Sequence, residues 1–201
     1  DEADRTLDDN TEAKPKSFYA LSKFMAEDYM IRNHNQAIQY TIIRPTTVYG
    51  RYDRGNINRM FNLAKKRIMP ILGDGKNLKS LIYVENLVEG LIKVILNEQA
   101  YDQSFILSDQ RPYTMNEVVA TMEKVAGKKV ISFHIPTKIV FALLKLLNSI
   151  CLMSLNKVMF DIASIKKLLT NNVFDNSKAR KLIGYEPRYT LLEGLKKTYT
   201  D

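Results

Sequence analysis

The 201-residue sequence predicts an α/β fold, and three observations support this prediction. The first apolar stretch has helical spacing and contains no Gly or Pro. A short run rich in β-branched residues follows and is stopped by Pro45, as expected of a strand. Helix-like and strand-like segments then keep alternating, which is the order of elements in layered α/β proteins. Apolar residues make up 45% of the chain and charged residues 26%, so neither disorder nor a fibre is favoured.

The first half of the chain supplies its elements in regular order. Residues 1–15 are polar and end at Pro15, so we expect a loop there. A helix over residues 18–34 and a strand over residues 39–44 come next. The same criteria then predict a helix at about residues 57–66, a short strand at 69–72, a Gly-Asp-Gly turn at 73–75 and a strand at 80–84.

The second half continues this alternation, and one of its helices has a clear start and end. Thr114 and Glu117 have the Thr-x-x-Glu spacing of a capping box, and Gly127 follows the last apolar position, so the helix should run to Ala126. The remaining predicted elements are a helix at 85–96, strands at 104–107 and 130–135, and short helices at 175–182 and 191–198.

The segment at residues 139–155 is unusually apolar. A narrow polar stripe crosses it, because Lys138, Lys145, Ser149 and Asn156 recur at helical intervals. The charge at Lys145 and the modest length argue against a membrane span. We favour a helix that is buried on most sides over one that rests on a partner or on a bilayer surface.

Charge and cysteine content narrow the class of protein. The formal net charge is +8, but the basic residues fall in short groups without aromatic interleaving, so we expect solvated surface and no nucleic-acid partner. Attraction of an anionic substrate or of a membrane face is the alternative. The single Cys151 and the polar, acidic residues 1–10 indicate a cytoplasmic protein without a secretory signal. His34 and His134 have no partners at metal-ligand spacing, so we expect no metal site.

Tyr19 and Lys23 are the first candidates for catalysis. They are four residues apart on the first predicted helix, so their side chains share a face. An ammonium close to a phenol favours the phenolate, which makes such a pair suitable for acid/base work on a hydroxyl group. One Tyr-x-x-x-Lys is expected by chance in a chain with 11 Tyr, so other landmarks have to support it.

Five landmarks in order supply that support. They are Ser17-Phe18-Tyr19-Ala20-Leu21-Ser22-Lys23, Arg44-Pro45-Thr46-Thr47-Val48-Tyr49-Gly50, Gly73-Asp74-Gly75, Leu81-Ile82-Tyr83-Val84-Glu85-Asn86-Leu87, and Asp175-x-Ser177-Lys178-Ala179-x-x-Leu182-Ile183-Gly184-Tyr185-x-Pro187. In order and spacing they resemble the extended short-chain dehydrogenase/reductase family, which includes the NAD-dependent epimerases and dehydratases. The chain is most similar to nucleotide-sugar epimerases of bacterial surface-polysaccharide clusters.

The resemblance implies a fold and a division into domains. We expect the remnant of a doubly wound parallel-sheet domain of the Rossmann type, together with a smaller α+β substrate-binding domain. Residues 1–52 would be the last part of the dinucleotide-binding domain, and residues 53–201 mainly the substrate-binding domain. Residues 85–108 would return to the Rossmann sheet.

The resemblance also assigns cofactor and catalytic roles. Tyr19 would be the acid/base on a sugar hydroxyl. Lys23 would hold the nicotinamide ribose and stabilise the negative charge on the Tyr19 oxygen. Both would therefore contact the cofactor, for which we expect NAD, with NADP as the alternative. Pro45, Thr46 and Val48 would pass beside the nicotinamide.

Four further residues would bind the substrate. They are Thr47, Arg54, Asn56 and Lys79. Family members often carry Asn at the position of Thr47 and Arg at the position of Lys79. Lys79 keeps the charge but loses the planar fork that grips phosphate at two points.

Two family features are missing from the sequence. No Gly-x-x-Gly-x-x-Gly turn occurs, and neither does the Ser or Thr that lies about twenty residues before the tyrosine in the family. We therefore expect the C-terminal part of a longer enzyme, inactive by itself, with its exposed sheet edge and apolar surface open to association as a homodimer.

The expected reaction of the whole enzyme is epimerisation of a nucleotide-diphosphate sugar through a keto-sugar, with no membrane contact. One alternative is an NAD(P)-dependent dehydratase or reductase of the same fold that acts on another sugar or carbonyl substrate. The other is a non-catalytic binding or membrane-surface module.

Overall fold

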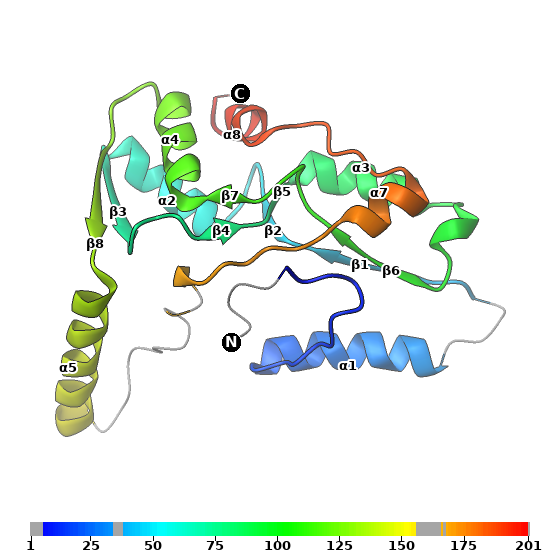
Figure 1. The fold of residues 1–201 in the computed structure, drawn as a ribbon, viewed down its shortest axis with the longest axis horizontal. Coiled ribbons are helices and arrows are strands. Elements are labelled where there is room, and N and C mark those ends of the chain that lie inside the picture. The colour runs from blue at the N-terminus through cyan, green and yellow to red at the C-terminus, as the bar shows by residue number, and fades with distance from the viewer. Residues whose placement is uncertain (1–5, 34–37, 156–165, 167, 201) are drawn as a thin grey trace.

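The computed structural model of the chain describes residues 6–33, 38–155, 166 and 168–200 (Figure 1). It confirms the α/β fold. Its first elements are α1 (Phe18–Asn33), β1 (Thr41–Pro45), β2 (Thr47–Tyr49), α2 (Asn56–Lys65), β3 (Ile68–Leu72), β4 (Leu78–Lys79), β5 (Leu81–Tyr83) and α3 (Val84–Val94). The later elements are η2 (Glu98–Ala100), β6 (Gln103–Leu107), β7 (Tyr113–Thr114), α4 (Met115–Ala126), β8 (Ile131–Ile135), α5 (Thr137–Leu155), α7 (Ser177–Ile183) and α8 (Leu191–Tyr199).

Parallel pairing between distant segments dominates the sheets. β1 pairs with β6 in a register that sets Ile43 opposite Phe105, and β2 pairs with β5. β3 pairs with β8, also in parallel, whereas the short β4 and β7 run antiparallel. Parallel partners need a crossover between them, so helices have to intervene in the chain, as they do here.

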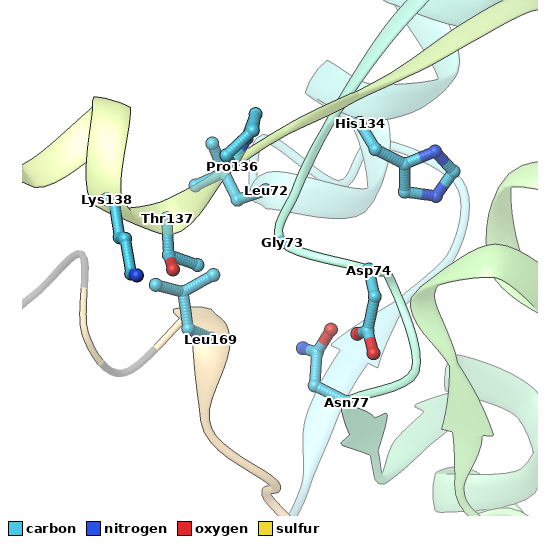
Figure 2. Close-up of a pocket in the computed structure, with 9 residues that line it drawn as sticks. All are labelled: Leu72, Gly73, Asp74, Asn77, His134, Pro136, Thr137, Lys138 and Leu169. Carbon is cyan, nitrogen blue, oxygen red and sulfur yellow. The ribbon is translucent and has the colours of Figure 1, made fainter.

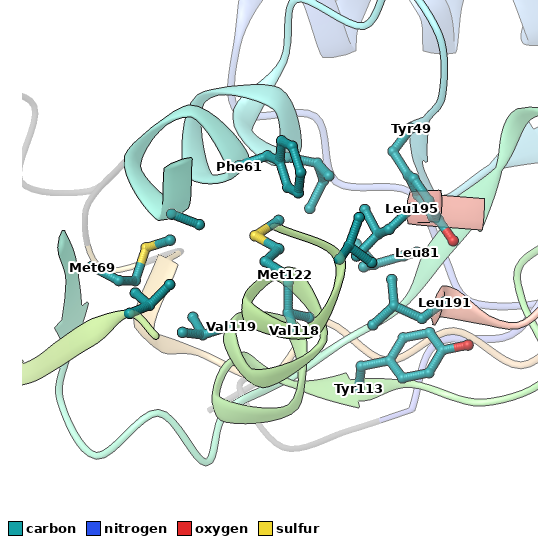
Figure 3. Close-up of a cluster of buried hydrophobic side chains, with 14 of the residues drawn as sticks. Tyr49, Phe61, Met69, Leu81, Tyr113, Val118, Val119, Met122, Leu191 and Leu195 are labelled. Atoms are coloured by element: carbon teal, nitrogen blue, oxygen red, sulfur yellow. The ribbon is translucent and has the colours of Figure 1, made fainter. Parts of the chain in front are cut away.

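The described residues form two hydrophobic cores, and the larger one holds the second part of the chain together (Figure 3). Phe61 of α2, Met69 of β3, Met122 of α4 and Leu195 of α8 meet there with almost no exposure to solvent. The smaller core lies between β6, α3 and α7, around Phe105, Leu107, Ile183 and Tyr185.

The long apolar helix α5 differs from its prediction. Among its described side chains only Leu144 is buried, and in Figure 1 the helix extends away from the rest of the fold. Ile139, Leu143 and Leu146 are 59%, 54% and 58% exposed. The expected burial on most sides is therefore wrong for the described side chains, because no described element covers them. Asn156, the last residue of the predicted polar stripe, lies outside the described residues.

Two further observations concern membranes and metals. Within the described residues, no helix has both the length and the hydrophobicity that a membrane crossing demands. His134 lies with its Nε2 3.2 Å from Oδ1 of Asn116, and His34 is outside the described residues. The described part of the chain contains no group of three or more His, Cys, Asp or Glu side chains that could hold a metal ion.

Candidate active site

Helix α1 presents the Tyr19 and Lys23 side chains together. The helix begins after Ser17, whose Oγ accepts a hydrogen bond from the Ala20 N–H at 3.2 Å, as a capping side chain does. Nζ of Lys23 lies 5.6 Å from the centroid of the Tyr19 ring, and Tyr19 is 74% exposed. A cation thus lies beside a phenol that an external molecule can reach.

An ion pair attaches α1 to strand β1. Nε of Arg44 donates to Oε2 of Glu27 at 3.0 Å, and Nη1 of Arg44 reaches the carbonyl oxygen of Asp9 at 3.4 Å. The hydrogen bond to Glu27 raises the pKa of the Arg44 guanidinium above its usual value. Because Pro45 follows Arg44 directly, the contact holds the α1 helix to the strand end where the next candidates lie.

Four candidates, Pro45 to Val48, occupy consecutive positions from the last residue of β1 into β2. The backbone N–H of Thr46 donates to the carbonyl oxygen of Leu107 at 3.0 Å, which continues the pairing with β6. The Thr46 hydroxyl oxygen is buried, and none of the described residues offers it a hydrogen-bond partner. The side chains of Pro45, Thr47 and Val48 are exposed. A ligand that reached this strand end would meet the exposed side chains of Pro45, Thr47 and Val48, with the Thr46 hydroxyl buried behind them.

A cavity of about 430 Å³ brings three of the predicted substrate residues together: Thr47, Asn56 and Lys79. Nζ of Lys79 donates to the carbonyl oxygen of Thr170 at 2.7 Å, and burial lowers the pKa of its ammonium. Lys79 is therefore fixed in position on the wall of the cavity. Arg54 does not line the cavity and lies exposed in the loop before α2.

Polar residues that the sequence analysis did not single out also line this cavity. They are Arg59, Asn77 and Asn172. Arg59 lies one helical turn after Asn56, so i to i+3 spacing on α2 could have identified it. Asn172 comes from a distant segment, and no local pattern points to it. The remaining wall is apolar, mostly from α2, β3 and α4.

A buried carboxylate supports the strand beside this cavity. Asp109 is 1% exposed, and its Oδ1 accepts from Asn86 Nδ2 at 2.7 Å and from the Tyr83 N–H at 3.0 Å. The Tyr49 hydroxyl donates to Oδ2 at 3.4 Å. Burial raises the pKa of the Asp109 carboxyl to about 6 and also raises the pKa of Tyr49. The carboxylate thus joins the end of β2 to β5 and α3. Sequence reasoning missed it, since a single Asp after a strand carries no signal.

Curated relatives match nearly the whole chain. The chain is 32% identical over 95% of its length to the N-acetyl-alpha-D-glucosaminyl-diphospho-ditrans,octacis-undecaprenol 4-epimerase of Escherichia coli O157:H7, and it covers 58% of that protein. It is 28% identical over 92% of its length to the UDP-glucose 4-epimerase of Vibrio cholerae, of which it covers 53%. The chain therefore spans about half the length of the curated relatives it matches.

The fold also matches solved structures. The chain superposes on UDP-glucuronic acid 4-epimerase from Bacillus cereus, solved in complex with NAD, with a TM-score of 0.73 at 18% sequence identity. That match covers 98% of this chain and 55% of the other, and it shows a Rossmann-type fold. The family model for the NAD dependent epimerase/dehydratase family matches residues 1–106, slightly more than half of the sequence. The chain belongs to the NAD dependent epimerase/dehydratase family.

Proposed function

We propose that the protein carrying this chain is an NAD-dependent epimerase of a nucleotide-diphosphate sugar. The observation that carries the proposal is the exposed Tyr19 phenol with Lys23 beside it, on a helix that Arg44 and Glu27 hold to β1. Family membership and relatives named as sugar 4-epimerases support the same reaction.

In this proposal each residue has a simple task. The Tyr19 oxygen accepts the proton of a sugar hydroxyl and later returns a proton to that sugar oxygen. Lys23 stabilises the negative charge on the Tyr19 oxygen and donates to the cofactor's ribose. Thr47, Asn56 and Lys79 face the diphosphate-linked group in the 430 Å³ cavity. NAD, when bound, would supply the reversible hydride acceptor that this reaction needs at the sugar carbon.

The residues present fit the nicotinamide end of the cofactor. The buried Thr46 hydroxyl without a hydrogen-bond partner and the open strand end at Pro45 and Val48 could contact the ring. For the pyrophosphate, the 201 residues offer no Gly-x-x-Gly-x-x-Gly turn. We therefore propose that this chain does not turn over substrate by itself.

The proposed domain division follows from the same reasoning. Residues 1–52 would belong to the dinucleotide-binding domain and residues 53–201 mainly to the substrate domain, with residues 85–108 returning to the sheet of the first. The parallel pairing of β1 with β6 supports this return. Cytoplasmic action and a homodimer also form part of the proposal, and α1, which buries none of its side chains, offers surface for an interface.

Tyr19→Phe tests the proposed chemistry. In the complete protein, with NAD and a panel of UDP-sugars, we expect the variant to lose about 10²- to 10⁴-fold in turnover number and little in substrate affinity, because it lacks only the proton-transferring oxygen. Tyr29→Phe is the matched control, since Tyr29 lies on the same helix and is 66% exposed. Equal activity of both variants would show that Tyr19 has no catalytic role.

A second candidate substrate is a sugar diphosphate carried on a polyprenol. The exposed apolar side of α5 and the name of the Escherichia coli relative favour it. The two candidates are separated by supplying the same sugar on UDP and on undecaprenyl diphosphate, and by measuring epimerised sugar from each. Turnover of the UDP-sugar alone would contradict the second candidate.

A further inference from the structure

Helix α5 exposes an apolar stripe that no described element covers. Ile139, Leu143 and Leu146 follow one another at i, i+4 and i+7, so they lie in one line along the helix. Each is more than half exposed. The partly or fully buried side chains Val140, Leu144 and Leu147 lie on the adjoining side. The exposed stripe is therefore separate from the side of α5 that carries its partly or fully buried side chains.

The charges on α5 are all of one sign. Lys138 and Lys145 are seven residues apart, both are exposed, and they border the apolar stripe. The sequence of α5 contains no Asp or Glu. Apolar side chains flanked by lysines fit the surface of an anionic bilayer, where the apolar groups enter the acyl boundary and the ammonium groups remain with the lipid phosphates.

A second cavity, of about 720 Å³, lies at the base of α5 (Figure 2). Thr137 and Lys138 from the start of the helix line one side, and Gly73 and Asp74 line the other. This cavity and the 430 Å³ cavity share Leu72 and Asn77 in their walls. A surface that engaged α5 would therefore lie next to a cavity that adjoins the candidate active site.

We propose that α5 docks the protein on an anionic lipid bilayer, lying in the plane of the membrane surface with Ile139, Leu143 and Leu146 inserted. This reverses the expectation of no membrane contact, which depended on the burial of α5. The proposal concerns a binding surface and holds whichever sugar is the substrate.

Vesicle co-sedimentation of the complete protein tests the proposal. The protein should bind vesicles that contain phosphatidylglycerol and bind much more weakly to vesicles of phosphatidylcholine alone. Leu143→Ser/Leu146→Ser should lower the partition coefficient at least about tenfold, because it removes inserted apolar surface. Lys138→Gln/Lys145→Gln should lower it about fivefold for each lysine on anionic vesicles only.

Matched controls lie on other helices. Ile92→Ser on α3 removes a side chain that is 61% exposed, and Lys181→Gln/Lys196→Gln removes two exposed charges from α7 and α8. Both controls should bind vesicles as the unchanged protein does, and thermal unfolding confirms that every variant is folded. The proposal is overturned if the unchanged protein ignores anionic vesicles or if the α5 variants bind like the controls. It is also overturned if the leucine variant only dissociates an oligomer in light scattering while vesicle binding persists.

Discussion

At the scale of single residues, Asp109 makes the stability of the fold depend on pH. Its folded pKa of about 6 exceeds the ordinary 3.8 because burial penalises the charged form. A carboxyl group with a raised folded pKa contributes its full stability below pH 3.8, where it is protonated in both states. That contribution is lost between pH 3.8 and about 6. Over this range the Asp109 carboxyl is ionised in the unfolded chain but still holds its proton in the folded one.

Asp109→Asn should remove this dependence. The amide oxygen can still accept from Asn86 and from the Tyr83 N–H, so the hydrogen bonds at Oδ1 survive. Relative to the unchanged protein, the variant should gain about 2 kcal/mol in unfolding free energy as the pH rises from 4 to 7. Urea denaturation of both proteins across this range measures the difference. A difference that stays constant with pH would contradict the assignment to Asp109.

The ion pair between Arg44 and Glu27 is a second prediction at this scale. Arg44→Met leaves a half-buried carboxylate without its partner, so we expect a loss of about 1–3 kcal/mol in unfolding free energy. Arg32→Met is the control, because Arg32 pairs with Asp28 on the same helix but in solvent, and its loss should stay below about 0.5 kcal/mol. Chemical denaturation measures both, and equal losses would show that the pair does not attach α1.

At the scale of elements, helix α4 owes its start to its capping box. The Thr114 hydroxyl oxygen accepts from the Glu117 N–H at 3.1 Å, and the Glu117 carboxylate accepts from the Thr114 N–H at 2.8 Å. Thr114→Ala should cost about 1 kcal/mol of unfolding free energy. Thr121→Ala, in the interior of α4, should change it by less than about 0.5 kcal/mol, since Ala favours a helix. A smaller loss at Thr114 than at Thr121 in urea titrations would refute the role of the cap.

The elements that the sequence predicts well carry their own local signals. Capping residues and apolar periodicity placed α4 and α3 within one or two residues. β2, β4 and β7 escaped prediction because two or three residues cannot establish a pattern, and only pairing with a distant strand defines them. The burial of α5 was mispredicted for a related reason: periodicity shows which residues share a side, but not whether another element covers that side.

The difference between local signals and contacts of distant elements also explains which residues of the candidate site could be predicted. Tyr19 and Lys23 lie on one helix, so their proximity follows from spacing alone. The family likeness supplied Thr47 and Lys79, and loop position supplied Asn56 and Arg54. The fold brings Thr47, Asn56 and Lys79 into one cavity, whereas Arg54 lies outside it. Asp109 depends on three elements meeting, which no local reading of the chain reveals.

At the scale of the whole molecule, the proposed binding of a nucleotide sugar and of NAD depends differently on these 201 residues. Most of the wall of the 430 Å³ cavity comes from five elements, α2, β3, β4, β5 and α4, and Thr47, Asn77, Leu168 and Asn172 complete it. The large core contains residues from four of these five elements and is also within the chain. We therefore expect a nucleotide sugar to bind at these residues, whereas binding of NAD needs a glycine-rich turn that the sequence lacks.

The isolated chain should accordingly bind UDP-glucose in isothermal titration and show no micromolar affinity for NAD. Replacing Asn56 with Leu should weaken UDP-glucose binding about tenfold, because a polar group on the cavity wall is lost while its volume is kept. Arg54→Leu is the control, since Arg54 lies in the same loop region but outside the cavity, and it should leave the affinity unchanged. Micromolar binding of NAD would mean that the chain holds the pyrophosphate by other groups, and the proposal that it is inactive alone would then fail.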